Sequence, residues 1–230
     1  GTAVVLRDEA AIFVDGRYTI QVREQVDGRL YEYQSVPQTS PGAWLAAHVR
    51  PGMVIGYDAW LHAKPWADGA ASALKACGAS LKAVDSNPLD AVWEDQPAPS
   101  PAPAVPHADQ YAGQSVAEKR AQVAQWLEAR GADAAVVTAL DGVAWLLNMR
   151  GADVSRTPVA LSFVIAHADG TADLFIAPEK VNPALVAHLG NAVRLHDRAA
   201  FVPALKAFGG KTVAVDPERA VAAVFHALEE

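Results

Sequence analysis

The sequence predicts an α/β protein of two tandem, homologous units, each built on a mixed β-sheet flanked by helices. Three observations lead to this prediction. Segments with strand and helix patterns alternate along the chain, a proline-rich stretch divides it, and the order of segments before that stretch returns after it.

The composition is that of a globular protein with a sizeable core. The chain has 230 residues, of which 51% are hydrophobic and 20% charged, enough for one large or two small domains. The net charge of -7 and the absence of Lys/Arg runs argue against a nucleic-acid partner. Cys77 is the single cysteine, which favours a reducing compartment such as the cytoplasm. Without an apolar run of about 20 residues or a signal-peptide pattern, we expect a soluble protein that is not bound to a membrane.

The division between the units lies in a stretch that runs from Glu94 to His107, "EDQPAPSPAPAVPH". Its five prolines exclude a helix or a central strand and favour an extended spacer. We therefore expect a first domain over residues 1–95, a proline-rich linker over 96–112 and a second domain over 113–230.

The second unit opens with a helix. Ser115 followed by Glu118 is a capping-box pattern, and Gly131 stands where a helix ends. The apolar face of this helix is expected to consist of Val116, Val123, Trp126 and Leu127.

The rest of the second unit alternates between strands and helices. After a short strand in "DAAVVTAL" come two strands that meet at Asp169-Gly170, a dipeptide that favours a tight hairpin. "PALVAHLG" and "AAFVPALKAFGG" predict helices, whereas "AVRLHD" and "KTVAVDPE" predict strands.

The first unit repeats part of this order. A hairpin turns at Arg7-Asp8-Glu9, a helix follows in "SPGAWLAAHVRPG", and the next strand closes on Asp58 as its counterpart closes on Asp216. An internal duplication explains this order, and a generic α/β rhythm is the alternative. The first unit has no counterpart of residues 115–140, and the chain stops inside a helical pattern, so we expect a piece of a longer protein.

Motifs of catalysis are missing from the sequence. It contains no H-E-x-x-H, no G-x-S-x-G, no G-x-x-x-x-G-K-[ST] and no G-x-G-x-x-G after a strand. Its seven histidines are scattered without ligand spacing, and Cys77 occupies an apolar helical position. We therefore predict no catalytic residue and no metal ligand in this chain.

Two loops stand out as candidate sites. "FVDGRY" places Asp15 and Arg17 around a glycine at a strand end, and "NMRGADVSRTP" places Arg150 and Asp153 around another glycine. An arginine there can form a bidentate contact with a ligand carboxylate or a structural ion pair. The sequence alone leaves both interpretations open.

The stretch "TALDGVAWLLNMRGADVSRTPVALSFVIAHADGTADLFI" resembles the second domain of the three-domain Xaa-Pro aminopeptidases. "GTAVV", "FVDGRYTIQ" and "NPLDAVWEDQP" resemble the first domain of that family and its exit into the linker. The resemblance implies two tandem domains of the creatinase N-terminal type, with a ribonuclease-H-like motif. The start of the first domain is expected to be missing.

The resemblance also implies what the chain does and lacks. In that family a third domain, of the pita-bread fold, holds two divalent metals, usually manganese, and removes the N-terminal residue that precedes proline. This chain would bind no cofactor and be inactive alone; it would shape the active-site entrance, contact its own pita-bread domain and support a homodimer. The implied residues on the side of the peptide substrate are Arg17 and Tyr18, followed by Arg150 and Asp153. The segment Trp145 to Leu147 is expected to be a buried plug under the second loop.

Two other functions are consistent with parts of this resemblance. Creatinase-like domains also occur in a histone chaperone that has lost its metals and binds peptides. Prolidase and creatinase are further relatives, but they usually carry one N-terminal domain instead of two.

Overall fold

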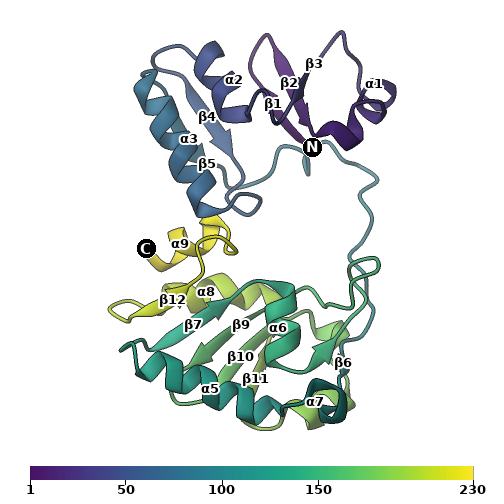
Figure 1. Cartoon of the computed structure of the whole chain (residues 1–230), viewed down its shortest axis with the longest axis vertical. Coiled ribbons are helices and arrows are strands. Elements are labelled where there is room, and N and C mark those ends of the chain that lie inside the picture. The colour runs from purple at the N-terminus through teal and green to yellow at the C-terminus, as the bar shows by residue number, and fades with distance from the viewer. Residues whose placement is uncertain (230) are drawn as a thin grey trace. The chain divides into compact units, whose positions relative to one another are not determined.

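The computed structural model describes residues 1–229, which divide into two compact units (Figure 1). Unit 1 consists of Gly1–Asp58 and Pro65–Asn87, and unit 2 consists of Ala59–Lys64 together with the chain from Pro88 onward. No helix among the described residues is long and apolar enough to cross a membrane.

Unit 1 contains two small sheets of different size. In the first, β1 pairs antiparallel with β2 and β2 pairs parallel with β3; in the second, β4 and β5 pair in parallel. The strands are β1 (Thr2–Val5), β2 (Ala10–Val14), β3 (Glu32–Ser35), β4 (Val54–Tyr57) and β5 (Ser80–Ala83). The helices are α1 (Gln21–Gln25), α2 (Pro41–His48) and α3 (Lys64–Ala76), with a 3-10 turn at Gly16–Tyr18.

The two sheets of unit 1 share one hydrophobic core, which α2 and α3 complete. Ser40 begins α2, because its hydroxyl accepts a hydrogen bond from the Ala43 N–H and Pro41 occupies the first turn. The helix buries Trp44, whose ring meets Phe13 of β2 edge-on with 6.3 Å between centroids.

Unit 2 is built on a five-stranded mixed sheet in the order β11-β10-β9-β7-β12. The β9–β10 and β7–β9 pairs are antiparallel, whereas β10–β11 and β7–β12 are parallel. The strands are β7 (Ala134–Val137), β9 (Ser162–His167), β10 (Ala172–Ile176), β11 (Val193–His196) and β12 (Val213–Val215).

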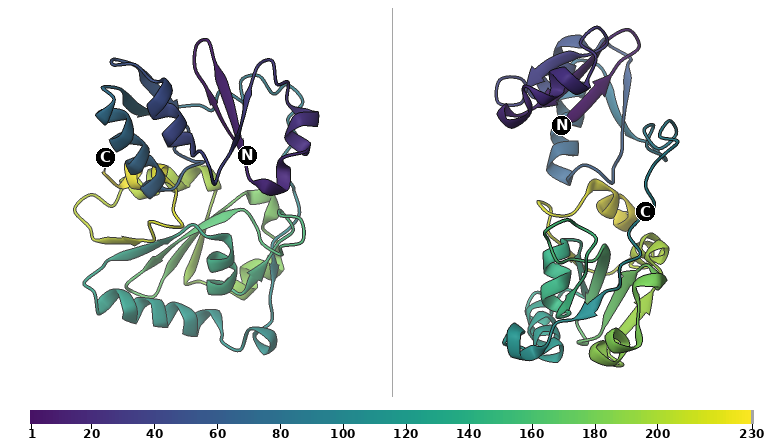
Figure 2. Two further views of the ribbon diagram at one scale, coloured as in Figure 1. Left: turned by 45° about the horizontal axis from the view of Figure 1, so that its top comes forward. Right: turned by 90° about the vertical axis from the view of Figure 1, so that its right-hand side faces the viewer.

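Helices cover both faces of this sheet, as the left view of Figure 2 shows with α5 below it and α8 and α9 above it. Apolar residues of α5, α6 and α7 pack on one face, and those of α8 and α9 on the other. The helices are α4 (Asp109–Ala112), α5 (Val116–Glu128), α6 (Leu140–Leu146), α7 (Pro183–Leu189), α8 (Phe201–Lys206) and α9 (Ala222–Glu229). Two 3-10 turns lie at Pro178–Lys180 and Arg198–Ala200.

The strand pairing repeats between the two units, in agreement with the predicted duplication. β1, β2 and β3 pair as β9, β10 and β11 do, and each set is followed by a helix (α2, α8) and a strand (β4, β12). In unit 2, β7 joins β9 to β12, whereas the structure assigns no strand to the corresponding position between β1 and β4 among the described residues.

Several local predictions are confirmed. Ser115 and Glu118 form a reciprocal capping box at the start of α5. The β9–β10 hairpin turns at Gly170, whose φ of 81° lies in the left-handed region that favours glycine. Trp126 contradicts the predicted apolar face of α5, because it is 45% exposed and the Arg130 guanidinium stacks 4.1 Å from its ring centroid.

The proline-rich stretch is extended, as predicted, but its C-terminal part is packed on unit 2 and is not a free spacer. Val105–Pro106 (β6) pairs antiparallel with Met149–Arg150 (β8), so the stretch forms a small two-stranded sheet. Ala104, which precedes this sheet, is fully buried, and its N–H donates to the Lys180 carbonyl. This docking brings the chain before α4 beside the loop that follows α6.

Candidate functional site

A pocket of about 340 Å³ opens in unit 2 beside α6 and the small β6–β8 sheet. Its lining combines aromatic rings with both signs of charge. The residues that determine its chemistry are Tyr111, Lys119, Asp141, Trp145, Asn148 and Arg150. All of them belong to unit 2, so the pocket is a feature of that unit alone.

Asn148 is the polar centre of this region. It is 1% exposed, follows the last turn of α6, and adopts a φ of 42°, which asparagine tolerates better than most residues. Its Oδ1 accepts from Lys119 Nζ at 2.6 Å, and its Nδ2 donates to the Gln114 carbonyl at 2.7 Å and to Asp109 Oδ1 at 3.1 Å. The amide therefore joins α4, α5 and the end of α6 at one point.

Lys119 is a buried cation whose hydrogen-bond acceptors are neutral. It lies on α5, is 2% exposed, and donates to Asn148 Oδ1 and to the Trp145 carbonyl at 2.9 Å. Its Nζ also lies 4.7 Å from the Trp145 ring centroid, within range of a cation–π interaction. Burial lowers the pKa of Lys119, and the positive charge of Arg150 lowers it further.

Arg150, predicted as a site residue, lines the same pocket. Its Nη1 donates to the Met149 carbonyl at 2.9 Å and to the Ala144 carbonyl at 3.1 Å. The next residue, Gly151, fixes the path of the loop: a Cβ there would lie 2.7 Å from Ala160 N, so a larger residue would force the two segments apart. The Arg-Gly pair thus holds a guanidinium at the pocket while its backbone packs closely against Ala160.

The segment predicted to be a buried plug is only partly buried. Leu146 and Leu147 are at most 2% exposed and belong to the core between the sheet and its helices. Trp145 is 49% exposed and lines the pocket. Consecutive residues of a helix point about 100° apart, so an apolar run cannot lie entirely on one face.

Asp153, the other site residue predicted in this loop, lies in a buried ion pair. Its Oδ1 accepts from Lys180 Nζ at 2.6 Å, and the two side chains are 1% and 3% exposed. Its Oδ2 accepts from the Leu161 N–H at 2.7 Å. Burial raises the pKa of the Asp153 carboxyl, but the hydrogen bonds from Lys180 and Leu161 outweigh burial and hold it below the ordinary value. Lys180 also donates to the Ser100 carbonyl, which ties the proline-rich stretch to the loop.

Arg17 and Tyr18 lie in unit 1, on the 3-10 turn that follows β2. Arg17 forms a bidentate pair with Asp15, at 3.0 Å from Nε to Oδ1 and 2.8 Å from Nη2 to Oδ2. The Arg17 side chain is 81% exposed, and its guanidinium lies 5.7 Å from the Tyr18 ring centroid. The hydrogen bonds from Arg17 lower the pKa of Asp15 to about 2.

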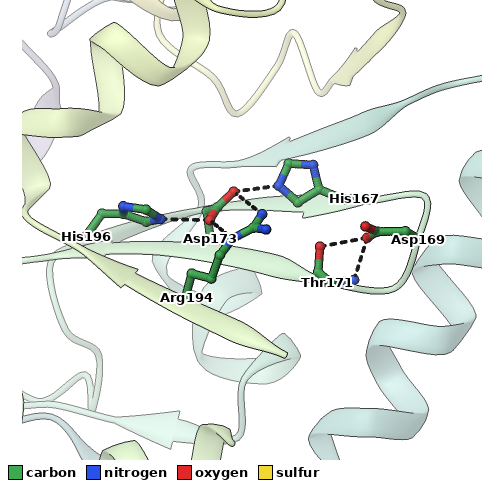
Figure 3. Close-up of polar contacts among 6 residues, drawn as sticks. All are labelled: His167, Asp169, Thr171, Asp173, Arg194 and His196. Atoms are coloured by element: carbon green, nitrogen blue, oxygen red, sulfur yellow. Dashed lines mark hydrogen bonds and ion pairs between the residues drawn. The ribbon is translucent and has the colours of Figure 1, made fainter. Parts of the chain in front are cut away.

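A second polar cluster centres on Asp173 of β10, between the hairpin and β11 (Figure 3). One carboxylate oxygen accepts from His196 Nε2 at 2.7 Å and from Arg194 Nε at 2.6 Å. The other contacts His167 Nε2 at 2.6 Å and Arg194 Nη2 at 2.9 Å. Burial raises the pKa of Asp173, and these three partners together lower it further than burial raises it. Figure 3 also shows Asp169 and Thr171 closing the hairpin turn beside the cluster.

The residues of this cluster do not fit a metal ion. Both oxygens of Asp173 are occupied by the Arg194 guanidinium, a cation that would repel a divalent metal. Among residues 1–229, no group of three or more His, Cys, Asp or Glu side chains could hold a metal.

Sequence reasoning missed the residues that carry both clusters, although a signal existed for each. Lys119 falls three residues after Val116 and four before Val123, so it lies in the apolar stripe of α5. Arg194 and His196 alternate on β11, which places both on one face of the sheet. Their partner Asp173 could be found only once the β10–β11 register was known, in which Asp173 lies opposite Arg194.

The family comparison assigns the same domain type to both halves of the chain. The model of the creatinase/prolidase N-terminal domain matches residues 1–91, and a second model of that description matches residues 95–230.

Similar proteins extend this likeness over most of the chain. A probable Xaa-Pro aminopeptidase P of Aspergillus clavatus is 36% identical over 196 residues, which cover 84% of this chain and 30% of that protein. Its counterpart in Chaetomium globosum is 37% identical over 186 residues, 79% of this chain and 30% of that protein. A further match is the crystal structure of X-prolyl aminopeptidase from Caenorhabditis elegans, described as a cytosolic enzyme with a di-nuclear active site. It covers 96% of this chain and 38% of its own length, with a TM-score of 0.88 and 27% identity. The chain therefore spans about a third of the length of these relatives.

Proposed function

The chain belongs to the creatinase/prolidase N-terminal domain family, with one copy of the domain in each half, and we propose that it is the N-terminal, non-catalytic region of an Xaa-Pro aminopeptidase. The observation that supports this most is the similarity to aminopeptidase P sequences over 84% of the chain, across both units in order. The C. elegans structure supports it further, because the match covers 96% of the chain and therefore includes the folds of both units.

In this proposal the chemistry belongs to the rest of the longer protein. A catalytic domain C-terminal to this region would hold two divalent metals, manganese in our proposal. These metals would activate a water to attack the peptide bond before proline. The two units described here would contribute no metal ligand and no catalytic residue, and the chain alone would not hydrolyse peptides. We place the longer protein in the cytoplasm.

The proposed role of the two units is to shape the entrance of the active site and to support a homodimer. The substrates would be peptides with proline at the second position. Arg17 and Tyr18 are the first candidates for contacts with such a peptide, because their side chains are exposed on a turn at a strand end. Arg150, which lines the pocket of unit 2, is the next.

Asp153 is the weakest of the four candidates for a direct contact with substrate. Its carboxylate is 1% exposed and is already paired with Lys180, so a peptide could reach it only by displacing that pair. We propose that Asp153 acts indirectly, by fixing the loop that carries Arg150.

Hydrolysis of an Arg-Pro-Pro peptide in the presence of manganese tests the proposal. We expect release of arginine by the longer protein and none by the 230-residue chain. Hydrolysis by the purified chain would show that the chemistry lies within these residues and would overturn the assignment. Inactivity of both proteins would favour a metal-free relative that binds peptides.

A further inference from the structure

The pocket beside α6 contains two cations that have no carboxylate partner. Neither Lys119 nor Arg150 forms an ion pair within residues 1–229, although most buried charges in proteins are paired. Their acceptors are backbone carbonyls and the Asn148 amide oxygen, which are neutral. The inner wall of the pocket therefore keeps a positive charge.

Donors remain available on both cations. Lys119 uses two of its three N–H groups in hydrogen bonds, and Arg150 uses only Nη1, so that its Nε and Nη2 have no acceptor in the part of the chain that the structure describes. A planar guanidinium edge with a neighbouring ammonium suits two oxygens of one anionic group.

We propose that this pocket binds a monocarboxylate that carries an aromatic or apolar group. The carboxylate would lie between Lys119 and Arg150, and the apolar group would pack on the exposed faces of Trp145 and Tyr111, which are 49% and 74% exposed. The inference is independent of the proposed peptidase activity, because it depends on unit 2 alone.

The acidic residues around the pocket select a single negative charge. Asp109 accepts a hydrogen bond from Asn148, and Asp141, which also forms an exposed ion pair with Arg219 at 3.3 Å, is part of the lining, so two carboxylates offset part of the field of the two cations. A phosphate dianion would add repulsion with both aspartates. A bound carboxylate would also raise the lowered pKa of Lys119, because an anion beside the amine favours its protonated form.

Titration of the 230-residue chain with benzoate, followed by ¹H–¹⁵N NMR, tests the site. We expect saturable shifts at the Trp145 indole and the Asn148 side-chain amide, with a dissociation constant of about 1 mM for so small a ligand. Benzamide, which has the same shape without the charge, should bind at least ten times more weakly. Equal binding of benzoate and benzamide, or tighter binding of phenyl phosphate than of benzoate, would overturn the proposal.

Three substitutions locate the binding. Arg150→Gln should weaken benzoate by about tenfold or more, because it removes one charge-assisted contact. Asp141→Asn should strengthen benzoate binding several-fold, because it removes an opposing charge from the pocket. It also breaks the Asp141–Arg219 ion pair, but both side chains are more than half exposed (59% for Arg219, 72% for Asp141), so we do not expect the chain to unfold. Arg130→Gln is the matched control: Arg130 also lies near a tryptophan in unit 2, but it does not line the pocket. If neither Arg150→Gln nor Asp141→Asn changes the affinity, the pocket is not the binding site.

The same titration of the longer protein distinguishes two sources of the carboxylate. If benzoate binds there as it does to the chain, the ligand is a free molecule. If benzoate binds to the chain but causes no shifts in the longer protein, an Asp or Glu side chain of the longer protein already fills the pocket. Both results support the site, whereas absence of benzoate binding to the chain overturns it and leaves the hydrolysis experiment unaffected.

Discussion

Two buried lysines of unit 2 differ in the partners that surround their charged amino groups. Lys180 is 3% exposed and faces the Asp153 carboxylate, while Lys119 is 2% exposed and faces an amide oxygen, a carbonyl and an indole ring. The first charge is neutralised inside the protein, and the second is not. Lys180 therefore has the features of a structural tie, and Lys119 those of a site that can attract an anion.

The surroundings of each lysine agree with this division. Lys180 and Asp153 connect three segments far apart in sequence: the proline-rich stretch, the loop after α6 and the turn that follows β10. Lys119 lies at the wall of a pocket together with a second cation. A buried pair is expensive to break, whereas a buried charge with neutral partners leaves part of its cost uncompensated.

The largest expected effect comes from replacing each lysine with methionine, which keeps the length of the side chain. Lys180→Met leaves the Asp153 carboxylate buried and unpaired, so we expect a loss of about 3–5 kcal/mol in the free energy of unfolding. Lys119→Met leaves two neutral acceptors unsatisfied but also removes a buried charge, so we expect a loss of at most about 2 kcal/mol. Urea unfolding of the two variants measures the difference.

The double variant Lys180→Met/Asp153→Leu provides the control for this pair. Replacing both partners by apolar groups should restore much of the stability lost in Lys180→Met, because no unpaired charge remains. Equal losses in the two single variants would contradict the comparison between the lysines.

The elements of the fold could be predicted from the sequence because their signals are local. The capping box at Ser115 and the hairpin turn at Gly170 are each encoded within a few residues, and both formed as expected. Trp126 and Trp145 were placed wrongly, since an apolar residue is buried only where another element covers it. That cover depends on packing between distant segments.

The candidate site could be predicted only in part, for a related reason. Arg150 was identified from its loop, and the structure finds it at a pocket. Lys119 was not identified, although it lies 31 residues before Arg150, because the two approach each other only when α5 packs beside α6. Asp153 was identified with Arg150, but its partner Lys180 lies 27 residues further along the chain, and the pair could not be read from the loop alone.

A smaller effect is expected in the dependence of stability on pH, to which Asp153 and Lys119 contribute in different pH ranges. The pKa of Asp153 lies below its ordinary value of 3.8, so its ion pair stabilises the fold above about pH 4 and this contribution is lost as the pH falls. The pKa of Lys119 lies below 10.5, so the folded state releases that proton first and the free energy of unfolding rises as the pH approaches 10.5. Near neutral pH both side chains are charged. The fold favours the charged form of Asp153, whereas it disfavours the charged form of Lys119.

Urea unfolding in these two windows measures both slopes. Asp153→Asn should flatten the decline in stability as the pH falls below the ordinary carboxyl pKa of 3.8, and Lys119→Met should flatten the rise in stability as the pH approaches 10.5. Lys119→Met is the control for the acid window, which it should leave unchanged because it removes no partner of Asp153. A Lys119→Met variant that changes the acid window, or that leaves the alkaline rise as steep as before, would show that other groups set these slopes.

The smallest effect on stability is expected at the exposed ion pair of unit 1, which completes the comparison. Asp15 and Arg17 form a bidentate contact at 2.8 and 3.0 Å, somewhat longer than the 2.6 Å of the buried Lys180–Asp153 pair, and the arginine side chain is 81% exposed. Water and salt screen such a contact, so Arg17→Gln should leave the urea midpoint of the chain unchanged.

The same substitution should nevertheless change the titration of Asp15, which NMR of its carboxyl carbon can follow. The pKa of about 2 depends first on the Arg17 side chain and second on the hydrogen bond from the Arg17 N–H, which a glutamine retains. We therefore expect a pKa between 2 and the ordinary 3.8. Asp27, which pairs with Arg29 in the same way on another exposed turn, is the internal control and should not move. A changed urea midpoint in Arg17→Gln would mean that an exposed ion pair of good geometry stabilises the fold. That result would contradict the comparison with Lys180, in which burial decides how much an ion pair contributes to stability.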